Sequence, residues 1–403
     1  MLTLADIEAA RDRITGHVHH TPLDHSTTFS EMTGASVRLK LETFQRTGSF
    51  KIRGATNRIM TLSPEEQAAG VITASAGNHA QGVALAAKGI GVDATIVMPE
   101  HAPIAKVNAT RGYGATVVLH GIDYTEAAEK AAEIAASEGR TYVHAFNDPV
   151  VMAGQGTIGL EIMADCPTVD TVVVPIGGGG LISGIATAVK GIDPSVRVVG
   201  VQAEGAASVP QSLERGEIFE RESVDTIADG IATRRVGDAC FEIIKERVDE
   251  VVTVSDSETA SALLYVLERG KTLVEGAGAV PLAAVLAERF DYESDEVIVP
   301  ALCGGNIDLT VLTTVILRGL AETGRHVTIR TVLKDRPGAL VHLATIIADH
   351  GANITAIHHD RTSGDIAMNA AEVEIDLETR GHEHAQTLIG ALKSADYTVE
   401  ILD

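Results

Sequence analysis

VVVPIGGGGLISG, residues 172–184, joins a run of valines to a helix-forming stretch through four consecutive glycines. Continuous valine is typical of a strand buried on both faces of a parallel sheet. Gly177, Gly178, Gly179 and Gly180 let backbone N–H groups converge where the next helix begins, and the helix dipole adds partial positive charge there. Because one or two glycines would be enough for a tight turn, we interpret this stretch as an α/β turn that binds a phosphate group.

Two other phosphate-binding patterns match this stretch less well. A dinucleotide fold, with Glu204 after the next strand as its ribose-binding acid, needs the spacing G-x-G-x-x-G. That spacing is not met, because Gly177 and Gly179 are followed by Ile182. A Walker loop is excluded, because the GKT at 270–272 has no glycine five residues before it. The glycine turn (residues 177–180) therefore suits one phosphate better than two.

The pattern of an apolar strand followed by a helix recurs along the chain. Strands are predicted at 37–42, 70–75, 93–99, 115–120 and 171–176, and each precedes a predicted helix, at 51 onward, 79–89, 103–114, 124–139 and 181–191. This alternation predicts an open α/β architecture with mostly parallel sheets to about residue 320. Ligands are expected beyond the carboxyl ends of the strands. Residues 326–403 instead predict the order strand, helix, strand, strand, helix, strand, which is the ferredoxin-like βαββαβ motif of a separate small domain.

The composition limits the possible classes of function. A chain of 403 residues is expected to form two or three domains. Its net charge of −23 disfavours nucleic acid and anionic membranes, whose binding needs basic patches. No uncharged apolar stretch is long enough to span a bilayer, and the three cysteines are typical of reduced thiols. We therefore expect a cytoplasmic protein without nucleic-acid or membrane partners.

The stretch TGSFKIRGA, residues 47–55, surrounds one lysine with small and apolar neighbours. In one interpretation Lys51 and Arg53 are surface charges at the start of an amphipathic helix, with Phe50 and Ile52 pointing inward. In the other, Lys51 is a partly desolvated amine with a depressed pKa, poised to form a Schiff base. This segment alone does not decide between the two.

Two further turns follow apolar strands and carry polar side chains. SAGNHAQG, residues 75–82, gathers Ser75, Asn78 and His79 at a helix N-terminus, which predicts a carboxylate site, or else a helix cap made by Ser75. PALCGGNIDL, residues 300–309, contains Cys303, which is either an inert buried thiol or a ligand-facing one. The histidines at 19–20, 358–359 and 382–384 lack the spacing of metal ligands, so no metal site is expected.

An activated lysine, a site for one phosphate, a carboxylate site and a polar side chain after a late strand together describe pyridoxal phosphate with an amino acid. The chain resembles the fold-type II pyridoxal-phosphate enzymes, and among them the threonine dehydratases (threonine ammonia-lyases) that carry one C-terminal ACT domain. The resemblance covers essentially the whole chain. It rests on the motifs SFKIRGA (49–55), SAGNHAQG (75–82), GGGGL (177–181), DGIA (229–232), EGAGA (275–279) and CGGN (303–306).

The resemblance implies the following domains and cofactor contacts. A catalytic domain would span 1–322, with a small subdomain at about 45–146 inserted in a larger one, and an ACT regulatory domain would span 326–403. Lys51 matches the lysine that holds pyridoxal phosphate as a Schiff base, and Phe50 the residue packed against its ring. Asn78 matches the asparagine that hydrogen-bonds the 3′-oxygen of the cofactor, and Cys303 stands where the family places a serine or cysteine against the pyridine nitrogen. The phosphate loop would be Gly177, Gly178, Gly179, Gly180 and Leu181.

The family's substrate contacts match the turn at 75–82. The substrate carboxylate would lie at Ser75, Ala76, Asn78 and His79, while Glu275 and the Gly230 peptide match positions near the cofactor ring. The implied reaction is β-elimination, from L-threonine to 2-oxobutanoate and ammonia and from L-serine to pyruvate, with the Lys51 amine as the general base. A neutral group beside the pyridine nitrogen makes the ring a weaker electron sink, which favours elimination.

Related alternatives share most of these motifs. Serine racemases need a second acid–base group, a serine at the position of Ala76, and their metal site is incomplete here because Pro210 replaces an aspartate beside Glu204. Mammalian-type serine dehydratases have a small residue at the position of His79. Other classes are a non-catalytic amino-acid sensor that works through its ACT domain, and a nucleotide-binding oxidoreductase, which the glycine spacing disfavours.

The ACT-like segment contains two turns that would bind a regulatory ligand. Pro337 and Gly338 follow its first predicted strand, and Gly351 and Asn353 precede its second. In ACT domains such turns line a small-ligand site where two domains pair. The resemblance therefore implies an amino-acid effector and a homo-oligomer, either a dimer or a tetramer.

Overall fold

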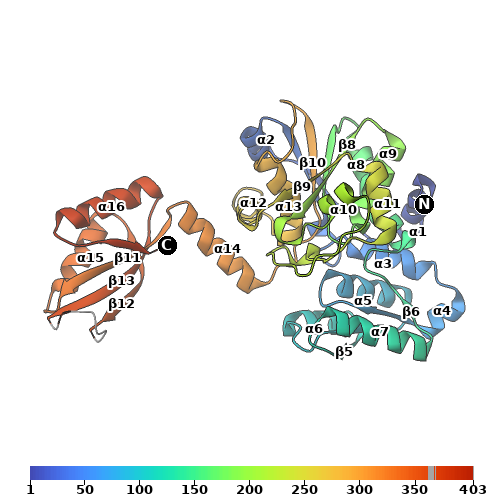
Figure 1. Cartoon of the computed structure of the whole chain (residues 1–403), viewed down its shortest axis with the longest axis horizontal. Coiled ribbons are helices and arrows are strands. Elements are labelled where there is room, and N and C mark those ends of the chain that lie inside the picture. Colours follow the sequence, from blue (N-terminus) through green and yellow to red (C-terminus); the bar gives the residue numbers. More distant parts are fainter. Residues whose placement is uncertain (362–366, 368, 403) are drawn as a thin grey trace. The chain divides into compact units, whose positions relative to one another are not determined.

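The computed structural model describes residues 1–361, 367 and 369–402, and it divides into two compact units, Met1–Asp308 and Leu309–Asp403 (Figure 1). The first unit holds one mostly parallel and one fully parallel sheet, and the described residues of the second unit form an antiparallel sheet. Helix α14 (Leu309–Glu322), which we placed in the catalytic domain, is grouped with the second unit.

The larger sheet of the first unit has the strand order β1-β2-β10-β7-β8-β9. Its strands are β1 (Leu23–His25), β2 (Ser36–Leu41), β10 (Val297–Leu302), β7 (Thr171–Pro175), β8 (Arg197–Ala203) and β9 (Glu250–Val254). All neighbours are parallel except β1 and β2. Helices α9 (Gly180–Ile192) and α13 (Gly276–Leu286) pack against the central strands, so the valines of β7 are buried as the sequence predicts.

The smaller sheet is parallel throughout, with the strand order β5-β4-β3-β6. Its strands are β5 (Thr116–Leu119), β4 (Ala94–Met98), β3 (Val71–Ala74) and β6 (Thr141–Tyr142), and its helices are α5 (Asn78–Ile90), α6 (Ile104–Gly112) and α7 (Tyr124–Glu138). The other helices of the unit are α1 (Leu4–Ile14), α2 (Thr27–Thr33), α4 (Pro64–Ala69), α10 (Val209–Arg215), α11 (Asp238–Arg247) and α12 (Asp256–Glu268), with 3-10 turns at Glu42–Phe44, Glu204–Ala206 and Asp229–Ile231.

Two buried helices, α3 (Lys51–Met60) and α8 (Pro149–Asp165), lie between the two sheets' helices, since α3 packs against α5 and α8 packs against α9. The helices α3 and α8 cross at a glycine pair. A side chain at Gly154 would come within 2.6 Å of the Gly54 Cα atom, so no larger residue fits there without movement. Helix α8 was not predicted from the sequence. Because α8 is apolar and buried on nearly all sides, it has no polar face to give a helical period.

The second unit confirms the predicted βαββαβ order in its described residues. Its elements are β11 (His326–Lys334), α15 (Ala339–Asp349), β12 (Asn353–Asp360), β13 (Ala370–Glu378), α16 (His382–Ser394) and β14 (Glu400–Leu402), and the antiparallel sheet has the order β12-β13-β11-β14. The predicted span of 326–403 also includes residues 362–366, 368 and 403, which lie outside the described part of the chain.

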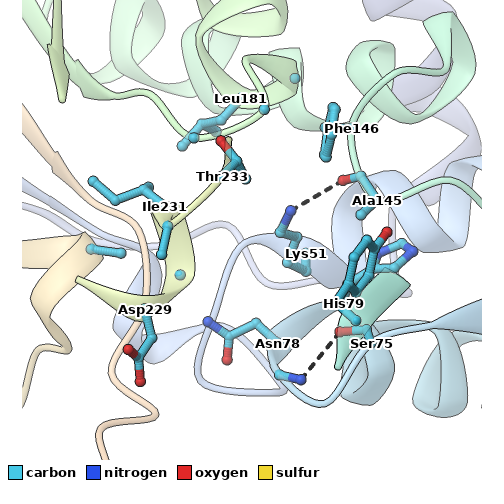
Figure 2. A pocket seen from close by; sticks show the side chains of 18 of the residues that line it. Lys51, Ser75, Asn78, His79, Ala145, Phe146, Leu181, Asp229, Ile231 and Thr233 are labelled. Atoms are coloured by element: carbon cyan, nitrogen blue, oxygen red, sulfur yellow. Dashed lines mark hydrogen bonds between the residues drawn. The ribbon is translucent and has the colours of Figure 1, made fainter. Parts of the chain in front are cut away.

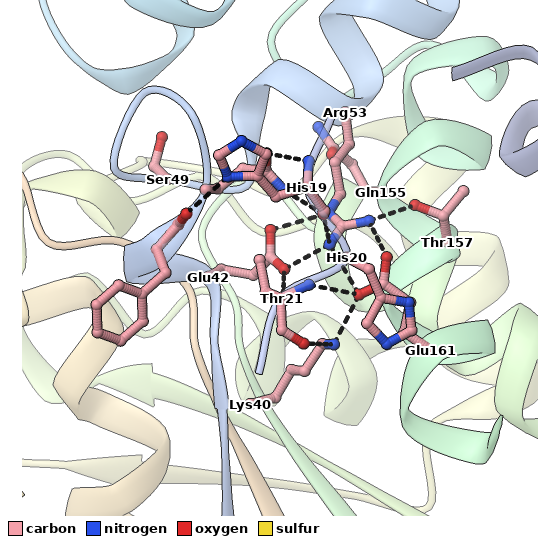
Figure 3. A network of polar contacts seen from close by, with 12 residues as sticks. His19, His20, Thr21, Lys40, Glu42, Ser49, Arg53, Gln155, Thr157 and Glu161 are labelled. Atoms are coloured by element: carbon pink, nitrogen blue, oxygen red, sulfur yellow. Dashed lines mark hydrogen bonds and ion pairs between the residues drawn. The ribbon is translucent and has the colours of Figure 1, made fainter. Parts of the chain in front are cut away.

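Arg53, on α3 two residues after Lys51, lies at the centre of a buried network of charges (Figure 3). It is 0% exposed, so the interpretation as a surface charge is wrong. Its guanidinium donates to Glu42 through Nε (2.9 Å) and Nη2 (2.7 Å). It donates to Glu161 on α8 through Nη1 (2.6 Å) and Nη2 (2.9 Å). The buried Lys40 amine, on β2, donates to Glu161 (2.6 Å) and to the Thr21 carbonyl (2.8 Å), so two positive groups balance two negative ones.

We expect Arg53→Met to lower the free energy of unfolding by about 3–5 kcal/mol, because it leaves Glu42 and Glu161 as buried charges without their shared partner. Urea unfolding followed by circular dichroism measures the change. The matched control is Arg11→Met, which removes an ion pair to Asp12 whose side chains are 52% and 72% exposed and should change stability by about 0–1 kcal/mol. Equal effects of the two variants would contradict the importance of the network.

Candidate active site

A cavity of about 760 Å³ opens in the first unit where strands of both parallel sheets end. Ala74 and Pro175, the last residues of β3 and β7, line it, as does Cys303, which follows β10. Its volume is typical of small-molecule sites. The structure brings together in this cavity most of the predicted site residues, namely Phe50, Lys51, Ser75, Asn78, His79, Gly177, Gly178, Gly179, Gly180, Leu181 and Cys303.

Lys51 is the first residue of α3 and lines the cavity. Its amine donates to the Ala145 carbonyl at 3.1 Å (Figure 2) and lies 5.0 Å from the centre of the Phe50 ring. Burial lowers the pKa of Lys51 to about 8, although the nearby Cys303 and Glu275 oppose the shift. An amine with this pKa is neutral in a far larger share of molecules at neutral pH than an exposed lysine, so it can act as a nucleophile and as a base.

The loop that leads into Lys51 is held by the turn after β10. The Phe50 N–H donates to the Cys303 carbonyl (3.1 Å), and the Gly305 N–H donates to the Gly48 carbonyl (2.8 Å). Ser49 and Gly304 form an isolated antiparallel bridge between these bonds. The turn at 303–306 therefore positions Lys51, although some 250 residues of chain separate the two segments.

The glycine turn leads from β7 into α9, as predicted. Gly179 has a φ of 94°, which favours glycine. Among the described residues, no carbonyl or side chain accepts the N–H groups of residues 177–180. Buried N–H groups without a protein partner are rare. Four such groups at a helix N-terminus are suited to bind an anion.

The absence of side chains in this turn has a steric cause that the sequence does not reveal. An added Cβ at Gly178 would lie 2.3 Å from the Phe146 ring, and one at Gly180 would lie 2.7 Å from the Phe146 carbonyl oxygen. Phe146 itself lines the cavity, in the loop that follows β6. Sequence reasoning missed Ala145 and Phe146, because no motif marks this loop.

The turn at 75–82 follows β3 of the smaller sheet and places polar groups on that side of the cavity. Asn78 is the first residue of α5, and the Ser75 hydroxyl accepts the Gly77 N–H at 3.1 Å (Figure 2). The His79 ring is buried and pairs with the Val143 carbonyl (2.9 Å), and burial lowers its pKa to about 3. A neutral ring held in this way has no charge to offer an anion. An anion at this turn would instead meet the α5 N-terminus and the Ser75 hydroxyl. The predicted Ala76 lies between two lining residues but does not itself line the cavity.

Cys303 is 3% exposed, and its thiol lies 3.6 Å from the Ala277 carbonyl. Burial raises the pKa of this thiol well above its usual range, so it stays protonated. In the described part of the chain, no group of three or more His, Cys, Asp or Glu side chains is arranged to hold a metal ion. No helix there is both long and apolar enough to cross a membrane.

Comparison with known families decides which class of site this is. The model of the family described as pyridoxal-phosphate dependent enzyme matches residues 14–304, and that of the ACT domain matches residues 327–396. The chain belongs to the pyridoxal-phosphate dependent enzymes. This family membership, with its ACT domain, confirms the predicted fold class, and the cofactor is pyridoxal phosphate.

Several curated relatives of this pyridoxal-phosphate enzyme match it closely. L-threonine ammonia-lyases of Thermotoga maritima (48% identical) and Geobacter sulfurreducens (50% identical) match over 100% of both chains. A catabolic L-threonine dehydratase of Staphylococcus aureus is 48% identical over 81% of this chain and 96% of its own. Among solved structures, maize serine racemase has a TM-score of 0.75 and 37% identity over 80% of this chain and 98% of that one. The processed threonine deaminase isoform 2 of Solanum lycopersicum has a TM-score of 0.74 and 39% identity over 78% and 86%.

The residues of the cavity fit pyridoxal phosphate. The buried Lys51 amine suits the aldehyde, and the free N–H groups of the glycine turn suit the phosphate. Asn78 and Cys303, which also line the cavity, offer a polar N–H and a neutral thiol to the ring. The fit rests mainly on the four buried N–H groups, because no protein group takes them among the described residues.

We expect Gly178→Ala to weaken the binding of pyridoxal phosphate and to cost about 1–3 kcal/mol of stability, because the new methyl group overlaps the Phe146 ring. Equilibrium titration with the cofactor and thermal unfolding of the apoprotein measure the two effects. The control Gly89→Ala lies inside α5 with nothing within 4 Å of the added Cβ, so it should bind normally and gain up to about 1 kcal/mol. Normal cofactor binding by Gly178→Ala would contradict the assignment of the phosphate site.

Proposed function

We propose that this enzyme catalyses the β-elimination of L-threonine to 2-oxobutanoate and ammonia, and that it also converts L-serine to pyruvate. The observation that carries the proposal is the buried Lys51 amine, which shares one cavity with the free N–H groups of the glycine turn and with Asn78. The names of full-length relatives support the same reaction. The net charge of −23 and the three free thiols support a cytoplasmic location.

In the proposed reaction, different groups of the cavity bind the substrate carboxylate and accept the Cα proton. Pyridoxal phosphate, when bound, withdraws electrons from the Cα atom of the amino acid and makes its proton acidic. The α5 N-terminus and the Ser75 hydroxyl bind the carboxylate of the substrate and fix the face that it turns to Lys51. The Lys51 amine, with its pKa lowered to about 8, accepts the Cα proton. Loss of the β-hydroxyl with one proton, as water, and hydrolysis by one water then give the oxoacid and ammonia.

Two side chains favour elimination over racemisation. The Cys303 thiol stays neutral because burial raises its pKa, and a neutral group does not hold a proton on the pyridine nitrogen as a carboxylate does. Ala76 has a methyl group where a second acid–base serine is needed for racemisation. The similarity to maize serine racemase therefore supports a shared fold and cofactor more than a shared reaction.

We expect Lys51→Ala to abolish both oxoacid release and the visible absorbance of the bound cofactor, because it removes the amine that holds the cofactor and takes the Cα proton. Absorbance spectra and a steady-state assay with threonine and serine measure the two losses. The control Lys130→Ala, which removes a lysine in an i,i+3 ion pair on α7, should retain both properties. Full activity of Lys51→Ala would make Lys51 a structural residue instead.

We further propose that the second unit binds an amino-acid effector and that the enzyme is a homo-oligomer. Pro337 and Gly338 precede α15, whereas Gly351 and Asn353 follow it. The 11 residues of α15 separate the two turns by about 16 Å at 1.5 Å per residue. Two copies of the domain are thus needed for both turns to line one small site, which favours a dimer or tetramer. Isoleucine and valine are the effectors expected of a biosynthetic enzyme.

We expect a chain truncated after Ala321 to retain elimination activity and to lose any response to isoleucine or valine. The cavity-lining residues all lie within Met1–Asp308, and the Staphylococcus aureus dehydratase matches only 81% of this chain. Steady-state kinetics with and without these amino acids, and calorimetry on the full chain, measure the response. Identical kinetics of both chains, with no effector binding to the full chain, would leave the second unit as a scaffold.

A further inference from the structure

The side chain of Asn78 is held by a chain of hydrogen bonds that begins at a backbone carbonyl. The Asn306 Nδ2 group donates to the Thr47 carbonyl (2.7 Å) and to Asn78 Oδ1 (2.8 Å). The Asn78 Nδ2 group in turn donates to Glu275 Oε1 (2.7 Å). The backbone N–H of Asn306 also acts on Glu275, where it opposes the rise in the pKa of the carboxyl group.

This series of hydrogen bonds permits only one orientation of the Asn306 amide and one of the Asn78 amide. A backbone carbonyl accepts and never donates, so the Asn306 nitrogen, not its oxygen, must face Thr47. Its second N–H then requires an acceptor, which fixes Asn78 Oδ1 on that side. The Asn78 nitrogen is thereby turned to Glu275. One of its two N–H groups remains without an acceptor among the described residues, and Asn78 lines the cavity (Figure 2).

Glycines make room for this arrangement. A Cβ at Gly304 would lie 2.4 Å from Glu275 Oε1 and 3.3 Å from Asn78 Nδ2. A Cβ at Gly48, which has a φ of 70°, would lie 2.6 Å from Asn306 Oδ1. Gly48 and Gly304 therefore leave room for the side chains of Asn306, Asn78 and Glu275 to approach one another, in addition to permitting the turns.

The orientation does not depend on the charge of Glu275. Burial raises the pKa of Glu275 to about 7, so the carboxyl group is partly protonated at neutral pH. A protonated carboxyl group still has an accepting oxygen for the Asn78 nitrogen. The orientation is set instead by the Thr47 carbonyl, which can only accept a hydrogen bond from Asn306.

We propose that Asn306 and Glu275 are positioning residues that lock the Asn78 amide with an N–H, and not an oxygen, toward the bound cofactor. A flipped amide would present its oxygen to the cofactor's own ring oxygen, and two acceptors repel each other. This inference rests on the proposed function, because it takes Asn78 to be a cofactor contact.

The test compares Asn306→Asp with Asn306→Ala. Aspartate has the size of asparagine but cannot donate to Asn78, and its carboxylate attracts the Asn78 nitrogen, which flips the amide. Alanine removes the lock without imposing a flip. We expect Asn306→Ala to raise the dissociation constant for pyridoxal phosphate about fivefold, as for one lost hydrogen bond. Asn306→Asp should raise it more and should shift the visible absorption band of the bound cofactor.

The double variant Asn306→Asp with Glu275→Gln separates orientation from charge repulsion, with Glu275→Gln alone as its reference. The Glu275→Gln substitution removes the second carboxylate, yet the new amide can donate to a flipped Asn78 oxygen and so keeps the flip. We expect the defect to persist in the double variant. Recovery of normal binding would assign the defect to repulsion and overturn the proposal.

Thermal unfolding of the apoproteins shows whether the variants fold. If Asn306→Asp does not fold, Asn306→Ala and Asn306→Ser still test the proposal, because serine is too short to reach Asn78 and should weaken cofactor binding as alanine does. Greater loss in Asn306→Ala than in Asn306→Asp would indicate a packing role and overturn the proposal. Normal cofactor binding by all the variants would do the same while leaving the proposed function intact, whereas a wild-type protein that binds no pyridoxal phosphate would overturn the proposed function itself.

Discussion

The position of Lys51, the proposed catalytic lysine, depends on an arginine that is held between two carboxylates. Arg53 bonds Glu42, just after β2, and Glu161, on α8, and so ties the start of α3 to both elements. Its guanidinium has enough donors to saturate both carboxylates, which is the condition under which buried ions are tolerated. The Gly54–Gly154 crossing lies one residue further along α3. Ion pairing and close packing thus fix the helix that begins with Lys51.

Burial then sets the chemistry of the cavity. It lowers the pKa of Lys51 to about 8 and that of His79 to about 3, and it raises the pKa of Cys303. All three shifts have the same physical cause, because a site with few water contacts disfavours every charged form. The lowered pKa makes the amine more available as a base, the imidazole is a neutral partner of a carbonyl, and the thiol stays neutral, as its proposed place beside the ring nitrogen requires. One low-polarity environment thus favours the neutral form of all three groups, whereas exposure would leave the amine almost fully charged.

The sequence predicted those parts of the site whose signal is local. The glycine turn, the turn at 75–82 and the strands before them are each contained in about a dozen residues, and the structure has them where they were expected. The missed features are contacts over long sequence distances. From the sequence alone Arg53 has the pattern of a surface charge, because its partner Glu161 lies far along the chain on α8. Likewise, no residue near Phe146 in the sequence indicates that its ring contacts Gly178. Helix α8 itself was not predicted, because a helix buried on nearly all sides has no alternation of apolar and polar residues at the helical period.

The turn at 303–306 lies between the candidate active site and the end of the first unit. It holds the loop before Lys51 through Cys303 and Gly305, and through Asn306 it orients Asn78. Two residues later the catalytic unit ends, and α14 begins the second unit. If the second unit regulates the enzyme as proposed, a signal that passes along the backbone would reach the first unit beside the residues that contact both Lys51 and Asn78. A displacement that breaks the Asn306–Asn78 bond would free the Asn78 amide to flip, and the flip would exchange a donor for an acceptor in the cavity.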